Sequence, residues 1–511
     1  MTRRQWSLVA ACAALLTLTA LWLFLWRRPL GHNGWQVTPN EVYWPLSEWI
    51  RAGIALLFFG GLAALAAYDR FRRAKTRKEQ TQSTVLSVFM LMSFATVWPW
   101  VLLGPGGAQN LVTVYWSDIS NEYFGTAYQV EDAREFSRDY TQRQQPKSVQ
   151  IAHVATHPPG AVLFFYGARR AYETSPFLQR TMTAFAEWII RANLNSVAIF
   201  SNQVRTTAAR SAGESDPSPL PLSAVPGALW AALLCSLALG LCVPAIYWLA
   251  SGAPLKHTPN EARGLLAAAL FAFVPTVGLY AFTLDALIAC GATWTLALTA
   301  HALSSQKNHW LLLGGIVMGL TSFLSIGALA TGAIVGLALL FAAWPRENRG
   351  ALFLRYAAFF GAGFFLAWVL LLLIFPMQPL EIFQNARAAH HFATLSNRGN
   401  WMLFNLPFFA LFCGWPIVVS SLMAWREKSS TAQSAILLGK AALWAMLLLT
   451  LSGNVKGEVE RLWLFLVPPL CALAASVIKP HQRRLWLPLL ALQAAQSILM
   501  AVGLAPLLKP L

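Results

Sequence analysis

Charged residues are scarce in this chain. Only 12% of its 511 residues are Asp, Glu, Lys or Arg, whereas 57% are hydrophobic. No stretch suggests a second, soluble domain of ordinary size. Many apolar runs of about 18 to 25 residues are instead long enough to cross a bilayer. The composition therefore predicts one integral, polytopic helical membrane protein.

Cysteine is also rare, and its placement excludes two kinds of framework. The six cysteines all fall in apolar runs and none has CxxC spacing: Cys12, Cys235, Cys242, Cys290, Cys413 and Cys471. Such cysteines behave as small buried hydrophobic residues. The sequence therefore indicates neither a disulfide scaffold nor a zinc site made of cysteine.

Acidic residues are outnumbered, 21 against 38 Lys and Arg, which leaves a net charge of +17. The basic residues recur in short loops between apolar runs, as expected of cytoplasmic loops in membrane proteins. Residues 69–80 carry six basic and two acidic side chains, which predicts a cytoplasmic loop. This distribution argues against nucleic acid as a binding partner and indicates that the chain is embedded in a lipid bilayer.

The order of apolar runs predicts an all-α polytopic fold with about 13 transmembrane helices. Residues 1–83 would hold two N-terminal helices, near 6–26 and 47–68, and the basic loop. Residues 84–511 would form the main module, with a third helix near 84–103. An outer-face loop, 105–226, would contain helices lying at the membrane interface, because charges interrupt its apolar segments.

A polar stretch, residues 116–160, opens this outer loop, and with its continuation to residue 219 it holds about half of the 21 acidic residues. Asp118 and Glu122 are four residues apart, so a helix would place both carboxylates on one face. One of them can then act as a general base toward an alcohol. The alternative is two solvated acids at a helix end, and residues 131–139 are more typical of a solvated helix face.

A second motif is Thr156-His157-Pro158-Pro159-Gly160. Proline is favoured in the first turn of a helix, so this motif predicts a helix start with His157 held beside it. The alternative is a capping turn with an incidental histidine. His153 lies four residues earlier, but two histidines without a clear third ligand are a weak indication of metal.

The other unusual polar residues are all predicted on the outer side: Asp285, Glu381, His390, His391, Arg398, Lys456, Glu458 and Arg461. Lys456 and Arg461 can neutralise a phosphate, with Glu458 orienting one of them. The alternative is an interfacial anchor of long side chains. Asp285 is the only acid in a long apolar neighbourhood, which favours a functional role, although helix capping would also explain it.

Together these motifs resemble the GT-C superfamily of membrane glycosyltransferases, including bacterial relatives of protein O-mannosyltransferases and of the aminoarabinose transferases that modify lipid A. Three features carry the resemblance: an outer-face acid after a membrane helix, interfacial helices that follow a Pro-Pro element, and an array of spans. The Gly457–Trp463 stretch, GEVERLW, also looks like a late outer-loop motif of bacterial members. The layout is similar from about residue 84 to residue 463.

The resemblance implies a polyprenyl phosphate sugar as donor and a hydroxyl of a glycan, lipid or protein as acceptor. It places the catalytic acid at Asp118, with Glu122 as the neighbouring carboxylate. It also implies direct displacement with inversion, with the donor phosphate near His157, Lys456 and Arg461. In the family a lysine precedes the prolines, so His157 departs from the pattern. A divalent metal ion is left open as a cofactor.

In this scheme Asp285 and Glu458 support the site, and His390, His391 and Arg398 shape the acceptor side or belong to a plain hydrophilic loop. The resemblance implies a multi-pass protein of the bacterial inner (plasma) membrane, with the active site on its periplasmic or extracellular face. The rival interpretation is a polytopic transporter or lipid flippase. Such proteins often contain internal repeats, and this sequence shows none. Neither the sugar nor the acceptor follows from the sequence.

Overall fold

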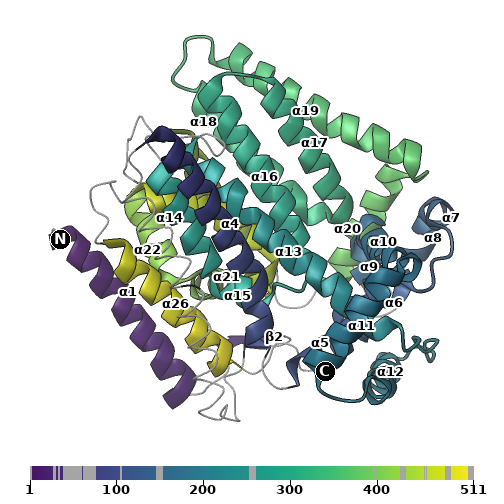
Figure 1. Cartoon of the computed structure of the whole chain (residues 1–511). Coiled ribbons are helices and arrows are strands. Elements are labelled where there is room, and N and C mark those ends of the chain that lie inside the picture. Colours follow the sequence, from purple (N-terminus) through teal and green to yellow (C-terminus); the bar gives the residue numbers. More distant parts are fainter. Residues whose placement is uncertain are drawn as a thin grey trace.

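The computed structural model describes residues 3–26, 30–32, 35–37, 60, 76–103, 106–144, 153–252, 261–394, 398–425, 433–453, 455, 457–477 and 485–504. Helices make up most of these residues (Figure 1). Within these ranges the only strands are β1 (Leu30–His32) and β2 (Trp35–Val37), which form a short antiparallel pair in which Leu30 is opposite Val37. The predicted all-α class is confirmed for the described chain.

Eight of the described helices are long and apolar enough to cross a membrane. They are α1 (Arg3–Leu21) continued by the π-helical turn η1 (Trp22–Trp26), α4 (Arg77–Leu102), α13 (Ala224–Ser251), α16 (Leu284–Ser305), α18 (Leu329–Ala343) preceded by η3 (Ile326–Ala328), α19 (Arg349–Ile374), α23 (Gln433–Leu451) and α26 (Trp486–Gly503). The chain is thus a multi-pass membrane protein.

The predicted number of about 13 spans is not confirmed. A bent helix pair would raise the described number from eight to nine, and two shorter apolar helices are α17 (His309–Leu324) and the segment Leu464–Ser476. That segment comprises η5 (Leu464–Leu466) and α25 (Val467–Ser476). The predicted helix near 47–68 lies outside the described residues, except for residue 60.

The start of α4 differs from the prediction. We expected a helix from about residue 84, but α4 begins at Arg77 and takes in the end of the predicted basic loop. The reason is a capping box, in which Thr76 Oγ1 accepts from Glu79 N–H and Glu79 Oε2 accepts from Thr76 N–H, each at 3.2 Å. Such reciprocal bonds satisfy two of the free amide donors at a helix start.

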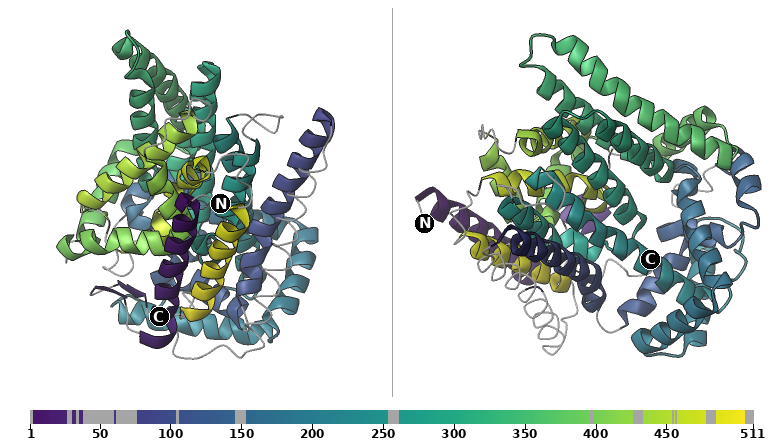
Figure 2. Two further views of the ribbon diagram at one scale, coloured as in Figure 1. Left: turned by 90° about the vertical axis from the view of Figure 1, so that its left-hand side faces the viewer. Right: turned by 45° about the horizontal axis from the view of Figure 1, so that its top comes forward.

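The long loop after α4 folds into short helices that gather at one end of the molecule (Figures 1 and 2). They are α5 (Gly107–Trp116), α6 (Asp118–Ala127), α7 (Ala133–Arg138), α8 (Tyr140–Arg143), α9 (His153–Thr156), α10 (Gly160–Thr174), α11 (Pro176–Ile190) and α12 (Leu194–Ser211). Exposed Phe177 and Trp188 on α11 fit the predicted interfacial helices. Residues 212–223 contain no helix or strand.

Two further helices break inside the apolar part of the chain. α14 (Glu261–Ala272) is followed by α15 (Pro275–Leu279), and α21 (Arg398–Cys413) is bent by 109° from α22 (Trp415–Ala424) at Gly414. α20 (Pro379–Thr394) precedes α21, so the predicted hydrophilic loop there is largely helical. α24 (Val459–Leu462) lies between α23 and α25.

Polar side chains of α26 accommodate these breaks. Gln496 donates to the Leu411 carbonyl at 2.7 Å and accepts from Trp415 N–H at 2.9 Å. Gln493 donates to the Cys413 carbonyl at 3.0 Å, and Ser497 donates to the Phe273 carbonyl at the other break. Because lipid offers no hydrogen bonds, backbone groups freed by a break need such partners inside the protein.

The short helices of the long loop pack on the spanning helices at Gly160. A Cβ atom at this position would lie 2.2 Å from the Phe323 carbonyl oxygen at the end of α17. No side chain larger than hydrogen fits there without moving backbone. The glycine of the HPPG motif is therefore required for α10 to reach α17.

We expect Gly160→Ala to displace α10 from α17 and to lower the unfolding temperature of the purified protein by several degrees, because the clash is with backbone rather than with a mobile side chain. Gly167→Ala on the same helix is the matched control, since nothing lies within 4 Å of a Cβ there. Replacing a helical glycine with alanine gains about 0.5–1 kcal/mol, so this control should be neutral or more stable. Equal unfolding temperatures for the two variants would refute the close approach.

Candidate functional site

The turn between α9 and α10, which carries His157, is held by two side chains of the α8 region. Tyr140 Oη lies 2.8 Å from the Val154 carbonyl oxygen and 2.7 Å from that of His157. Gln144 Nε2 donates to the Ala155 carbonyl at 3.1 Å. The predicted helix start is confirmed, with Pro159 as N-cap of α10. This turn is thus fixed by residues that the sequence did not single out.

Tyr123 of α6 packs against both histidines of this segment. Its ring centroid is 5.9 Å from that of His153 and 5.3 Å from that of His157, and its hydroxyl lies 2.8 Å from His157 Nδ1. We name Tyr123, His153 and His157 the imidazole half of the site. Burial raises the pKa of Tyr123 well above its usual range, so the side chain is a neutral phenol at physiological pH.

Both histidines of the imidazole half are neutral at physiological pH. Burial, followed by the nearby Arg461 guanidinium, lowers the pKa of His153 to about 4. Burial, followed by His153, lowers the pKa of His157 to about 4. Each side chain nevertheless keeps some accessible surface. A neutral imidazole that is partly accessible can contact a ligand.

A cluster of ionised residues forms the other half of the site, which we name the guanidinium half. Arg461 Nη1 donates to Asp285 Oδ2 at 3.0 Å, and Arg461 Nη2 donates to Glu458 Oε2 at 2.7 Å. Asp285 lies in the first turn of α16, where the helix dipole favours a carboxylate. Burial disfavours the charged guanidinium, but Glu458 and Asp285 outweigh it, so the pKa of Arg461 lies above its ordinary value.

The loop that carries Glu458 is shaped to make this contact. Gly457 and Glu458 both have positive φ, 69° and 54°, immediately before α24. A left-handed conformation costs a residue other than glycine about 1–2 kcal/mol, so the ion pair must maintain it. Two residues after Glu458, the Glu460 carboxylate accepts from Tyr280 Oη, with Oε1 at 3.3 Å.

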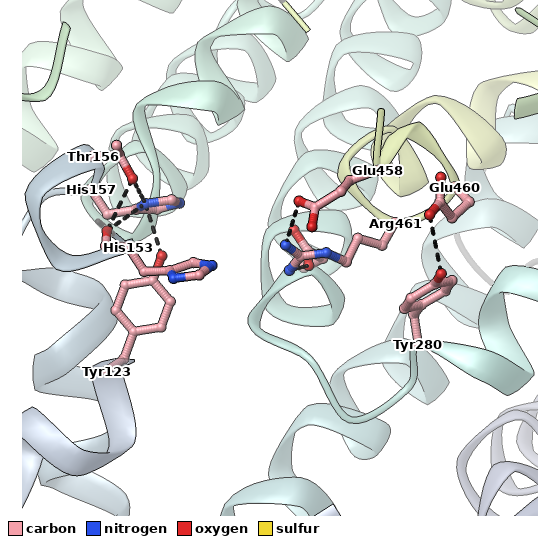
Figure 3. Close-up of polar contacts among 9 residues, drawn as sticks. Tyr123, His153, Thr156, His157, Tyr280, Glu458, Glu460 and Arg461 are labelled. Atoms are coloured by element: carbon pink, nitrogen blue, oxygen red, sulfur yellow. Dashed lines mark hydrogen bonds and ion pairs between the residues drawn. The ribbon is translucent and has the colours of Figure 1, made fainter. Parts of the chain in front are cut away.

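The two halves face each other, and Figure 3 shows the rings of His153 and His157 pointing toward Arg461. The charges of Arg461 and Asp285 both act on the pKa values of the two histidines, which places the halves within electrostatic range. His157, Asp285, Glu458 and Arg461 thus lie within electrostatic range of one another, whereas Asp118, which was predicted to belong to the same site, pairs with Arg205 instead. Their functional roles stay predictions.

Asp118, the predicted catalytic base, has a different environment. It is 5% exposed and accepts from Arg205 Nε, which lies 3.3 and 3.2 Å from its two carboxylate oxygens. Arg205 Nη1 in turn donates to the Ser218 carbonyl at 2.6 Å. A Cβ at Gly125 would lie 2.7 Å from Asp118 Oδ1, so this pair is packed tightly. No contact between Asp118 and either half is found among the described residues.

The expectation that Asp118 and Glu122 share one helix face is wrong. Asn121, between them, has non-helical torsions (φ −153°, ψ 68°) that kink α6. Glu122 therefore points elsewhere, and its Oε2 accepts from Val154 N–H at 2.9 Å. Glu122 is 3% exposed and tethers α9 to α6. Both predicted catalytic carboxylates are thus engaged in contacts that hold the outer helices together.

The remaining predicted residues lie around α20 or outside the described chain. α20 packs on α8 and α9, where Gln144 Nε2 donates to the Ile382 carbonyl at 3.0 Å. His390 and His391 are near its end. Arg398 begins α21, and the position of its side chain is not described; Lys456 lies outside the described residues. These positions give no support to a phosphate role for Lys456.

Sequence reasoning missed Arg205, Tyr140 and Gln144. Arg205 carried a weak signal, since an arginine on an otherwise apolar helix face needs a buried acid. Tyr140 and Gln144 carried none, because their partners are backbone carbonyls. Among the described residues no group of three His, Cys, Asp or Glu is arranged to hold a metal ion.

A scan against protein-family models finds no match to this chain, and a search of curated proteins finds no significant match either. The likeness to membrane glycosyltransferases therefore depends on the short sequence motifs alone.

We expect Asp118→Asn to lower the free energy of unfolding by about 3–5 kcal/mol, because it leaves the Arg205 charge buried without its partner. The double variant Asp118→Leu, Arg205→Met should recover most of this loss. Asp216→Asn serves as control, since it breaks the exposed Arg210–Asp216 pair, which is worth at most about 1 kcal/mol. Denaturant unfolding in detergent measures all three. A single variant as stable as the wild type would contradict a buried pair.

The two histidines also predict a pH dependence of stability. Their pKa is about 4 in the folded protein and about 6.5 when unfolded, so the unfolded chain binds more protons below pH 6.5. Stability should be constant above this pH and fall as the pH drops from about 6.5 toward about 4. Thermal unfolding across this range tests the prediction. The double variant His153→Asn, His157→Asn should flatten the profile, and an unchanged slope would contradict the assignment.

Proposed function

We propose that this protein is a membrane glycosyltransferase that moves a sugar from a polyprenyl phosphate donor to an acceptor hydroxyl on the outer face of the bacterial plasma membrane. The main support is the convergence of the imidazole and guanidinium halves. Their residues come from segments that are distant in sequence: Asp285 and Arg461 lie at the ends of apolar helices, and Tyr123, His153 and His157 come from the short helices and the turn before α10. Reactive polar groups at that depth suit a substrate with a lipid tail and a polar head.

The guanidinium half supplies a phosphate partner. A guanidinium has five N–H donors, and the ion pairs of Arg461 with Asp285 and Glu458 use two of its nitrogens, Nη1 and Nη2. Donors therefore remain for phosphate oxygens. These donors would hydrogen-bond the phosphate oxygens as the sugar departs, and transfer of the acceptor proton to Asp285 would remove the excess negative charge of the cluster.

Asp285 is the carboxylate best placed to act as base. Its Oδ2 holds Arg461, while Oδ1 has no hydrogen-bond partner among the described residues. In the proposed step Asp285 takes the proton of the acceptor hydroxyl, the acceptor oxygen bonds to the anomeric carbon, and the bond from that carbon to the phosphate oxygen breaks. A single displacement inverts the anomeric centre. This moves the role first expected of Asp118 to Asp285.

A polytopic transporter or lipid flippase is the second candidate, and the bent pair α21–α22 favours it, because broken helices are common at transport sites. The position of the guanidinium half favours a reaction at the membrane surface instead. Asp285 is in the first turn of its spanning helix and Arg461 precedes α25, so both lie at helix ends rather than mid-span.

The test is sugar transfer by purified protein in lipid nanodiscs, with a panel of radiolabelled polyprenyl phosphate sugars and with membrane lipids and glycans as acceptors. We expect Asp285→Asn and Arg461→Gln each to lower the rate by about 10²–10³, the usual cost of losing one charge-stabilising group. Asp216→Asn and Arg210→Gln are matched controls from an exposed pair and should leave the rate unchanged. Undiminished transfer by Asp285→Asn would exclude it as base.

Reconstitution of the same purified protein into sealed proteoliposomes separates the two candidate functions. In sealed proteoliposomes a flippase moves the intact labelled lipid between leaflets without breaking its sugar–phosphate bond. That outcome, with no transfer to any acceptor, would overturn the proposed function.

A further inference from the structure

The Nδ1 atom of His157 has three polar neighbours. It lies 2.8 Å from Tyr123 Oη, 3.0 Å from Thr156 Oγ1 and 3.1 Å from the His153 carbonyl oxygen. A neutral imidazole carries one proton, on Nδ1 or on Nε2, and the neighbours of one nitrogen decide which.

Two of these neighbours, the His153 carbonyl and Thr156 Oγ1, favour a proton on Nδ1, whereas the Tyr123 hydroxyl can donate to a bare Nδ1 or accept from a protonated one. The His153 carbonyl can only accept, so its contact with Nδ1 is a hydrogen bond only if Nδ1 donates. Thr156 Oγ1 donates its own proton to the same carbonyl at 3.0 Å, which leaves its oxygen able to accept from Nδ1. The opposite tautomer would direct two lone pairs, those of Nδ1 and the carbonyl, at each other. Nε2 therefore carries the lone pair.

This assignment decides what His157 can bind. The ring is neutral, because burial and His153 lower its pKa to about 4. It points toward Arg461 (Figure 3), and a bare lone pair on Nε2 can accept a hydrogen bond but cannot donate one. Phosphate oxygens also only accept. A phosphate at Nε2 would be repelled, whereas a hydroxyl there would donate to it.

The number of contacts that hold this turn supports a binding role. Tyr140 and Gln144 hold its backbone carbonyls, and Tyr123 holds the ring. These hydrogen bonds fix the orientation of the His157 ring before a ligand arrives, as is required of a preorganised binding group. A histidine that only capped a turn would not need its tautomer determined by its neighbours.

We propose that His157 Nε2 is a hydroxyl-recognition group, which accepts a hydrogen bond from a sugar or acceptor hydroxyl, while the lipid phosphate binds at Arg461. The identity of the hydroxyl as that of a sugar donor or its acceptor depends on the proposed function. The tautomer, and the exclusion of phosphate from Nε2, do not depend on it.

Nitrogen NMR of protein with ¹⁵N-labelled histidine in nanodiscs tests the tautomer, because protonated and bare imidazole nitrogens resonate far apart. His157→Gln identifies the signals by difference. We expect protonated Nδ1 and bare Nε2 in the wild type. Tyr123→Phe should leave this pattern intact, because the His153 carbonyl still accepts from Nδ1. A protonated Nε2 in the wild type would overturn the proposal.

Ligand addition to the same sample tests recognition without turnover. Three probes are added separately: polyprenyl phosphate, the same lipid carrying mannose, and a methyl glycoside as acceptor alcohol. We expect the Nε2 signal to move with the mannosyl lipid or with the glycoside, which distinguishes a donor hydroxyl from an acceptor hydroxyl. Polyprenyl phosphate alone gives the reference shift for phosphate bound at Arg461, and the absence of any further shift with the mannosyl lipid or with the glycoside would overturn the proposal.

Substitutions in the transfer assay give the third readout. His157→Gln keeps an acceptor oxygen near the position of Nε2 and should retain transfer within about tenfold, whereas His157→Lys replaces the acceptor with a cationic donor and should lose about a hundredfold, the cost of about 2.7 kcal/mol. The reverse order would mean that this position binds phosphate. Loss of all transfer in the wild type would refute the proposed function alone, since the NMR measurements would still decide the role of Nε2.

Discussion

The site depends on the paired guanidinium of Arg461, which donates to both Asp285 and Glu458. A cation at this depth is costly unless paired, and removing one partner of a buried ion pair leaves an uncompensated charge. The pair to Asp285 joins the start of α16 to the loop before α25, although 176 residues separate them. The positive φ of Glu458 shows that backbone strain is accepted to complete the contact. The guanidinium half is therefore fixed before any ligand binds.

The imidazole half is fixed by different means. Gly160 allows α10 to meet the carbonyl of Phe323, and the α9–α10 turn then lies where Tyr140 and Gln144 reach its carbonyls. The Asp118–Arg205 pair ties α6 to α12, and Glu122 ties α6 to α9. Residues that first suggested catalysis thus form the frame, and uncharged histidines occupy the face toward Arg461. The Asp118–Arg205 pair and the Glu122 contact thus hold the short helices around the two neutral histidines.

The apolar part of the chain follows the same rule of satisfied polar groups. The bend at Gly414 and the break after α14 free backbone carbonyls where lipid offers no partner, and Gln493, Gln496 and Ser497 of α26 supply the hydrogen bonds. Helix α26 therefore has a structural role beyond that of an ordinary apolar span. Helix α26 lies beside α1 (Figure 2) and also packs against α14, α15 and α22, and its fully buried side chains reach both breaks.

Local sequence patterns correctly predict the membrane class, the helical fold, the first span and the helix start after Pro158-Pro159. These follow from local composition, because apolar runs and proline act over a few residues. The sequence also predicted Asp118 as a general base. In the folded chain Asp118 pairs with Arg205, which is 87 residues away, and no local pattern links the two residues. The kink at Asn121, the partners of Arg461 and the tautomer of His157 are likewise tertiary outcomes. Each depends on which distant carbonyl or charge lies within about 3 Å, a distance at which hydrogen bonds form.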